Sequence, residues 1–242
     1  MSIFILMGCS STKVQVFEDF SDVNIIWPEY ERATYDLVLN NELSSEYETT
    51  IKKVLDGNRN VYTVDTIISN DSGMNMQGAV LSTYLDPISS YNKQIINGPN
   101  SSRSGEIIGY YEEDSLEIEM IYGEEYRSET VELPDNTIDN EYSLMLVRNF
   151  PLSYGYSRNL NMAVIAAEKV VPYSITVEGI EKVKVPYGEI ECYKVVWKHI
   201  GRGLVPNIYS WYSTENDKKM VKYVNENIEL HLRDYSSENS QS

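Results

Sequence analysis

The feature that most constrains this 242-residue chain is a strict alternation of apolar and polar side chains. It is clearest where Leu116, Ile118 and Met120 alternate with Glu117 and Glu119. Successive side chains of a strand point to opposite faces, so this strand has one apolar face and one acidic face. That arrangement is typical of an antiparallel sheet with one face on the core and the other in water.

Further apolar runs, separated by turn residues, repeat along the chain. Asp56-Gly57-Asn58 separates the run over 46–55 from a return strand that carries Tyr62 and Val64, which is the pattern of a β-hairpin. Twenty tyrosines against four phenylalanines fit half-buried sheet faces, because the tyrosine ring packs while its hydroxyl stays hydrated. We therefore predict a mainly β protein built on a single antiparallel, strongly curved sheet.

Length and charge limit the organisation and the partners of the chain. A hydrophobic content of 42% supplies one sizeable core, so we predict one β domain over 34–235 and a frayed tail over 236–242. The formal net charge of −17 repels phosphate backbones, which excludes nucleic acid as an expected partner.

One stretch interrupts the strand pattern and predicts a short helix. Asp139 is placed to act as its N-cap, the helix runs through Tyr142, Met145 and Leu146, and Pro151 stops it. A short apolar helix in an antiparallel sheet protein is expected to plug the open concave side of the sheet.

The N-terminus carries a motif that points to a membrane anchor. Leu6-Met7-Gly8-Cys9 resembles the bacterial lipobox, in which an apolar residue lies three before the cysteine and a small residue directly before it. The resemblance implies that 1–8 is the remnant of a shortened signal peptide and that Cys9 carries a lipid. Residues 9–33 are then a lipidated tether and lead-in segment. No other segment approaches the ~18–20 apolar residues of a membrane span.

The lipobox also implies a location. A lipoprotein of this kind lies in the cell envelope, faces the periplasm and is held to a membrane through its lipid. Ser10 follows the cysteine in place of the aspartate that often marks inner-membrane retention, which favours the outer membrane. The second cysteine, Cys192, lies within an apolar strand and is expected to be an ordinary buried thiol rather than a disulfide partner of Cys9.

Four short motifs in the C-terminal half resemble a bacterial envelope family known as domain of unknown function 3108. They are VPYG at 185–188, CYKV at 192–195, WYS at 211–213 and VKY at 221–223, and the likeness covers roughly 130–235. The resemblance implies a half-barrel sheet around a small helical plug, similar to the periplasmic lipoprotein-carrier proteins. It implies no catalytic residue, because none is assigned in that family.

The residue types give little support to an enzyme. No serine of the sequence lies in a G-x-S-x-G nucleophile motif, and two scattered histidines, His199 and His231, with one strand cysteine do not form a zinc pattern. We therefore expect no catalytic residue, no metal and no cofactor.

Three functions remain open, in this order. The first is a non-enzymatic, lipid-anchored envelope protein that binds a hydrophobic ligand or docks a protein partner on a concave sheet. The second is a structural or assembly module with a filled core, and the third is a hydrolase acting on glycan or lipid. The candidate ligand-facing residues are Tyr142, Met145, Leu146, Phe150, Trp197 and Trp211.

Overall fold

The fold is described from a computed structural model. The residues that it describes are 16–17, 20–69, 74–81, 89–97, 104–201 and 206–238. The predicted lipidation site Cys9 and the signal-peptide remnant lie outside these residues.

Strands dominate the described residues, with one short α-helix and one 3₁₀ turn. The elements are β1 Val16–Phe17, β2 Tyr30–Leu39, β3 Glu42–Asp56, β4 Arg59–Ser69, β5 Met74–Leu81, β6 Ser89–Ile96, β7 Gly105–Tyr111, β8 Ser115–Tyr122, β9 Glu125–Glu132, β10 Thr137–Asp139, α1 Ser143–Val147, β11 Ser157–Val164, η2 Ile165–Ala167, β12 Lys169–Val185, β13 Gly188–His199, β14 Ile208–Ser213, β15 Met220–Asn225 and β16 Ile228–Glu238.

All sixteen strands of the described residues belong to one sheet. Its order is β1-β11-β12-β13-β14-β15-β16-β2-β3-β4-β5-β6-β7-β8-β9, and β10 pairs with β11 beside this path. Every neighbouring pair is antiparallel except β1–β11 and β10–β11, which are parallel. The prediction of a mainly β protein with a single, largely antiparallel sheet and one short helix is therefore confirmed.

The predicted hairpin at Asp56-Gly57-Asn58 forms, and a second one forms around Gly123. Asp56 pairs with Arg59 across the β3–β4 turn, and Gly57 there has a φ of 59°. Tyr122 pairs with Glu125 across the β8–β9 turn, and Gly123 has a φ of 61°. Left-handed backbone of this kind is strained for residues with a Cβ, which explains glycine at both turns.

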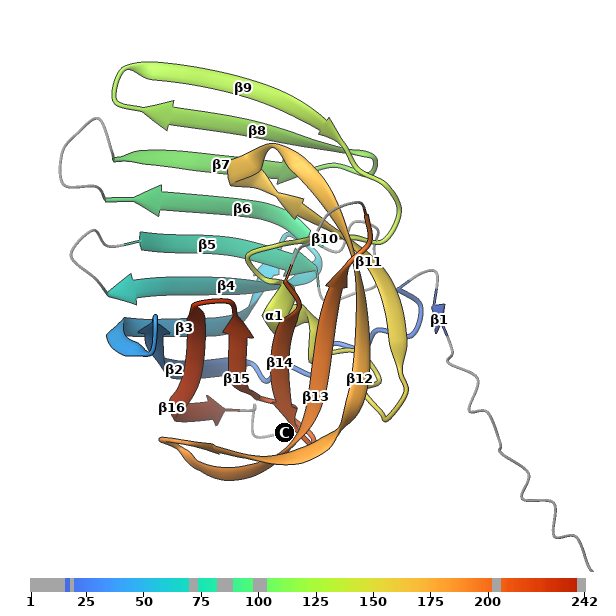
Figure 1. Ribbon diagram of the computed structural model, residues 1–242. Coiled ribbons are helices and arrows are strands. Elements are labelled where there is room, and N and C mark those ends of the chain that lie inside the picture. The colour runs from blue at the N-terminus through green and yellow to red at the C-terminus, as the bar shows by residue number, and fades with distance from the viewer. Residues whose placement is uncertain are drawn as a thin grey trace, which may run out of the picture.

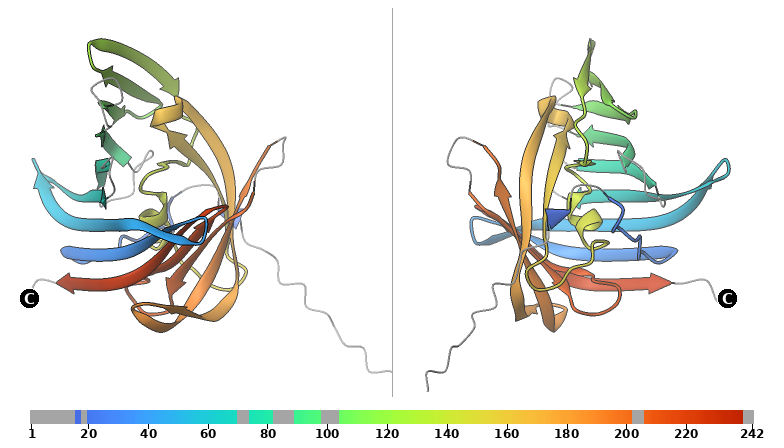
Figure 2. Two further views of the ribbon diagram at one scale, coloured as in Figure 1. Left: turned by 60° about the vertical axis from the view of Figure 1, so that its left-hand side comes forward. Right: turned by 90° about the vertical axis from the view of Figure 1, so that its right-hand side faces the viewer.

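The last strand of the described chain, β16, pairs with β2 in the middle of the sheet. Strand β16 pairs with β2, with Ile228 opposite Leu39 and Leu230 opposite Leu37. This pairing joins the strand set β2–β9 to the strand set β11–β16. Figures 1 and 2 show that the strands of these two sets run in crossing directions, with α1 between them.

The short helix begins later than the sequence indicated. Tyr142 is its N-cap residue and makes no side-chain capping bond, so the prediction that Asp139 caps this helix is wrong. Asp139 instead ends β10 and accepts a hydrogen bond from the backbone N–H of Glu141 at 2.7 Å. Its other carboxylate oxygen accepts from Asn92 of β6 at 2.7 Å and from the hydroxyl of Tyr111 of β7. These partners from distant strands hold the carboxylate away from the helix end.

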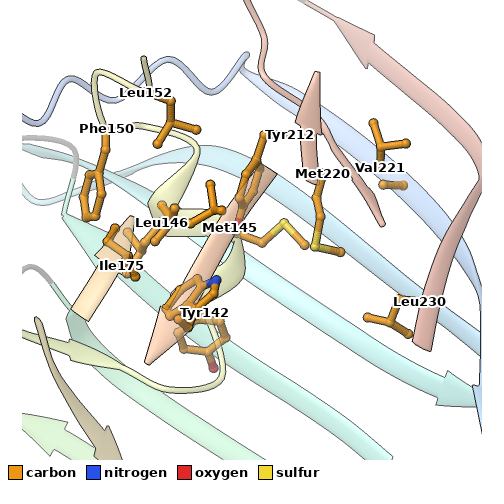
Figure 3. Packing of buried hydrophobic residues seen from close by; sticks show 14 of the residues in the cluster. Tyr142, Met145, Leu146, Phe150, Leu152, Ile175, Tyr212, Met220, Val221 and Leu230 are labelled. Carbon is orange, nitrogen blue, oxygen red and sulfur yellow. The ribbon is translucent and has the colours of Figure 1, made fainter. Parts of the chain in front are cut away.

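The helix is packed into the core between the two strand sets. Figure 3 shows Met145 of α1 pointing toward Met220 of β15, and both side chains are buried. Tyr142 lies against β5, because a Cβ added to Gly78 would come within 2.0 Å of the tyrosine ring. The hydroxyl of Tyr212 of β14 donates to the carbonyl oxygen of Leu144 at 2.9 Å. The helix thus contacts strands from both sets.

Candidate functional site

An apolar pocket of about 290 Å³ lies within the sheet. We call it the sheet pocket. Its walls come from β2–β5, from β11 and β13–β16, from the connection between β10 and α1, and from the first turn of α1. Its lining residues are Leu37, Leu39, Tyr47, Ile68, Met76, Asn140, Glu141, Ser143, Leu144, Met162, Trp197, Ile208, Tyr223, Ile228 and Leu230.

Strand alternation places the apolar part of this lining. Leu37 and Leu39 are two residues apart on β2, so both point to the same face of the sheet. Ile228 and Leu230 lie directly opposite them on β16 and share that face. Leu37 and Leu230 are buried, whereas Leu39 and Ile228 are 37% and 40% exposed. The exposed pair therefore marks the solvent-facing rim of the sheet pocket.

Trp197 of β13 contributes an indole ring to the lining. The ring is buried, and its Nε1–H donates to the hydroxyl oxygen of Ser210 on the neighbouring strand at 2.8 Å. Since a buried indole N–H needs a partner, this bond leaves the tryptophan to present only apolar surface to the pocket.

The polar part of the lining consists of Asn140 and Glu141 from the β10–α1 connection and Ser143 from the start of α1. The side-chain amide of Asn140 donates to Glu141 Oε1 at 3.1 Å, and the hydroxyl of Ser143 donates to the Asn140 carbonyl oxygen at 2.7 Å. These local bonds fix the chain before the helix. We call these three residues the polar end of the sheet pocket.

The ionisable groups of this region have perturbed acidity. Loss of hydration raises the pKa of the Glu141 carboxyl, and the nearby amides of Asn140 and Gln94 offset part of that rise. Burial raises the pKa of Asp139 to about 7, and the charge of Glu141 contributes, although the hydrogen bonds from Tyr111 and Asn92 act the other way. Desolvation also raises the pKa of Tyr223 to about 12. Asp139 is fully buried and does not line the sheet pocket.

The six predicted ligand-facing residues fall into three groups. Trp197 lines the sheet pocket. Tyr142, Met145, Leu146 and Phe150 are at most 2% exposed and belong to the core cluster, as Figure 3 shows. None of these four residues lines the sheet pocket.

Trp211, the sixth residue, faces the other way. It alternates with Ser210 and Tyr212 on β14, and its Nε1–H donates to Glu181 Oε1 at 2.6 Å. Its ring stacks on Tyr209 with 6.2 Å between ring centroids. Trp211 does not line the sheet pocket.

The sequence pattern did not identify Glu141 or the walls from β2–β5. It places Leu37 and Leu39 on one face, but nothing in the sequence shows that β2 pairs with β16. A single exposed leucine such as Leu39 is ordinary on a protein surface, so it gave no signal of a pocket rim. Glu141 gave no signal either, because a glutamate beside a helix start is usually a solvated residue.

Two further observations concern the whole described chain. None of its helices within the described ranges is both long enough and apolar enough to span a bilayer. The same residues contain no group of three or more His, Cys, Asp or Glu side chains arranged to hold a metal ion.

The fold and the pocket define a mainly β protein with an apolar pocket lined by strands of a single sheet and by the start of one short helix. The profile of the family described as "Protein of unknown function (DUF3108)" matches residues 34–227, and the chain belongs to this family. Comparison with curated proteins gives no match, and comparison with solved structures gives none either. The family description states no function, so the function is argued from the pocket.

Proposed function

We propose that this protein is a non-enzymatic, lipid-anchored envelope protein that binds a hydrophobic ligand in the sheet pocket. The pocket carries this proposal, because its walls are mostly apolar and its volume of about 290 Å³ is close to the lower limit of small-molecule sites. In this proposal the sheet is a half-barrel whose concave side holds the ligand, and α1 is the plug beneath it. Cys9 carries the lipid that holds the protein in the outer membrane.

The chemistry of the lining supports binding of an apolar ligand. Filling the pocket would remove Leu39 and Ile228 from water, and burial of apolar surface contributes about 25 cal/mol per Å². A few polar groups at one place, here the polar end, are the usual means by which such pockets orient a ligand. A molecule with one hydrocarbon part and one polar head group matches this distribution.

The binding proposal is tested with a fluorescent apolar probe, N-phenyl-1-naphthylamine. We expect the wild-type protein to enhance its emission and Leu39→Trp to abolish the enhancement, because the indole occupies the rim of the pocket. Leu55→Trp is the matched control, since Leu55 is 72% exposed on β3 and does not line the pocket. Equal enhancement by wild type and Leu39→Trp would show that the probe binds elsewhere and would contradict the proposal.

One observation favours the alternative of a structural or assembly module. Met145, Leu146 and Val147 of α1 are at most 2% exposed and belong to the core cluster, so a large part of the interior is filled. Native mass spectrometry of protein purified from the envelope separates the two functions. A co-purifying small apolar molecule supports the binding protein, whereas an empty chain in a stable complex with another protein supports the module.

The anchoring proposal has its own test. In a cell whose lipoprotein pathway processes the chain, Cys9→Ala is expected to move the protein from the membrane fraction to the soluble periplasmic fraction. Cys192→Ala is the matched control and should leave the protein on the membrane, because Cys192 is buried in β13. Recovery of the wild-type protein in the soluble fraction, without lipid, would refute the anchor.

A further inference from the structure

The polar end of the sheet pocket carries a charge that the rest of the lining does not balance. Glu141 is the one carboxylate among the lining residues, and no lysine, arginine or histidine is among them. The other ionisable groups of the lining are the phenols of Tyr47 and Tyr223. The described lining therefore offers a negative charge to a bound molecule and no positive one.

Glu141 also has no ionic partner elsewhere in the described part of the chain. Its carboxylate takes part in none of the ion pairs there, although the chain has many on its surface. Its carboxylate accepts a hydrogen bond from the neutral Asn140 amide at 3.1 Å. Glu141 lies on the pocket wall, where a bound molecule can reach it.

The groups around Glu141 are acids or neutral amides from several elements. They are Asp139 of β10, Tyr47 of β3, Tyr111 of β7, Tyr142 before α1, Tyr223 of β15, and the amides of Asn140 and Gln94. Burial is the main cause of the raised pKa of each of these phenols and of Asp139, and the charge of Glu141 adds to it. Every ionisable neighbour is thus an acid, and a positive charge is what this set lacks.

We infer that the sheet pocket selects amphiphiles whose head group is cationic or a neutral hydrogen-bond donor, with Glu141 as its acceptor, and discriminates against carboxylates. This inference rests on the proposed function and adds the class of ligand. An ammonium group donates a charge-assisted hydrogen bond to the Glu141 carboxylate and supplies the missing positive charge. A hydroxyl group donates a hydrogen bond to the same carboxylate without adding a charge. A carboxylate head group places two like charges at the same site, so one of them must take up a proton before binding.

The expected discrimination is large enough to measure. Two unit charges about 4 Å apart at a protein surface interact strongly even with partial screening, so we expect a difference of about tenfold or more in affinity. Glu141 is half-buried, and water at the pocket rim reduces the interaction without removing it.

The test is displacement of N-phenyl-1-naphthylamine from the full chain by dodecylamine, dodecan-1-ol and dodecanoate at pH 8, with the amine and dodecanoate below their micelle concentrations and the alcohol below its solubility limit. We expect the amine and the alcohol to displace the probe at a concentration about tenfold or more below that of dodecanoate. Glu141→Gln, with Glu141→Ala as the second variant, should reduce the difference between amine and dodecanoate to about threefold or less.

Two controls isolate the effect of the Glu141 charge. Glu113→Gln removes one negative charge at an exposed turn outside the pocket lining and should keep the wild-type selectivity. Binding of dodecylamine to Leu39→Trp, in which the pocket is blocked, measures non-specific attraction to the acidic surface. This amount is subtracted from the binding measured for the other variants.

The outcomes separate this inference from the proposed function. If dodecanoate binds as well as the amine to wild type, or if both Glu141 variants keep the wild-type ratio, the inference is wrong while probe binding still supports the pocket. If the probe does not bind in the pocket at all, both fail.

Discussion

The strongest stability prediction concerns the ion pair that holds α1 to the sheet. Arg148 follows the helix, and Glu31 is the second residue of β2, and both side chains are at most 2% exposed. Two guanidinium nitrogens of Arg148 donate to the two carboxylate oxygens of Glu31, one of them at 2.9 Å. Arg148 also donates from Nη2 to the carbonyl oxygen of Asp217 at 2.6 Å, and the Tyr235 hydroxyl donates to Glu31 at 2.8 Å.

Replacing Arg148 with Met keeps most of the length of the side chain and leaves the Glu31 carboxylate buried without its counter-charge. Breaking a buried ion pair on one side costs about 3–5 kcal/mol, because the remaining charge has lost its hydration and its partner. For a chain of this length that corresponds to a fall of roughly 6–20 °C in Tm. Urea unfolding followed by tryptophan fluorescence gives the free energy of unfolding for each variant.

A second variant and a control sharpen this test. In the double variant Glu31→Met/Arg148→Met no charge is left unpaired, so it should be less destabilised than Arg148→Met alone. Arg32→Met is the matched control on the same strand. Arg32 pairs with Glu48 at 2.6 Å, but its side chain is 52% exposed, so the variant should unfold close to wild type. An Arg148→Met variant as stable as Arg32→Met would refute the reasoning.

Two further predictions concern the region around Tyr142. Gly78→Ala should destabilise the protein by about 1–3 kcal/mol or more, because its Cβ would lie 2.0 Å from the Tyr142 ring; Gly179→Ala, with no atom within 4 Å, is the control and should be neutral in urea unfolding. The second prediction is that the buried carboxyl of Asp139 makes the free energy of unfolding fall as pH rises. Its folded pKa of about 7 exceeds 3.8, so the folded state holds a proton that the unfolded chain has released between those values. Asp139 thus contributes up to about 4 kcal/mol to the free energy of unfolding below pH 4, and this contribution is lost at pH 7 and above. In Asp139→Asn the free energy of unfolding, measured with urea from pH 4 to 8, should depend less on pH. An unchanged pH dependence in that variant would contradict the assignment.

Much of the fold could be predicted because the signals are local. Alternation around Ile118 and the glycine turns at Gly57 and Gly123 specify strand, hairpin and register within a few residues of one another. The helix boundary could not be predicted in the same way. Asp139 has the chemistry of an N-cap, but Asn92 and Tyr111 bind its carboxylate from strands 47 and 28 residues away along the chain.

The sequence by itself determined that this chain is a sheet protein, since period-two patterning and turn residues act over a few positions. The tertiary structure alone decided which of those strands enclose a pocket. Leu39 and Ile228 become neighbours only because β2 pairs with β16, and Glu141 meets an apolar wall only because α1 packs between the two strand sets. Such contacts join residues far apart along the chain, and their energies depend on burial and on partners that no short stretch of sequence contains.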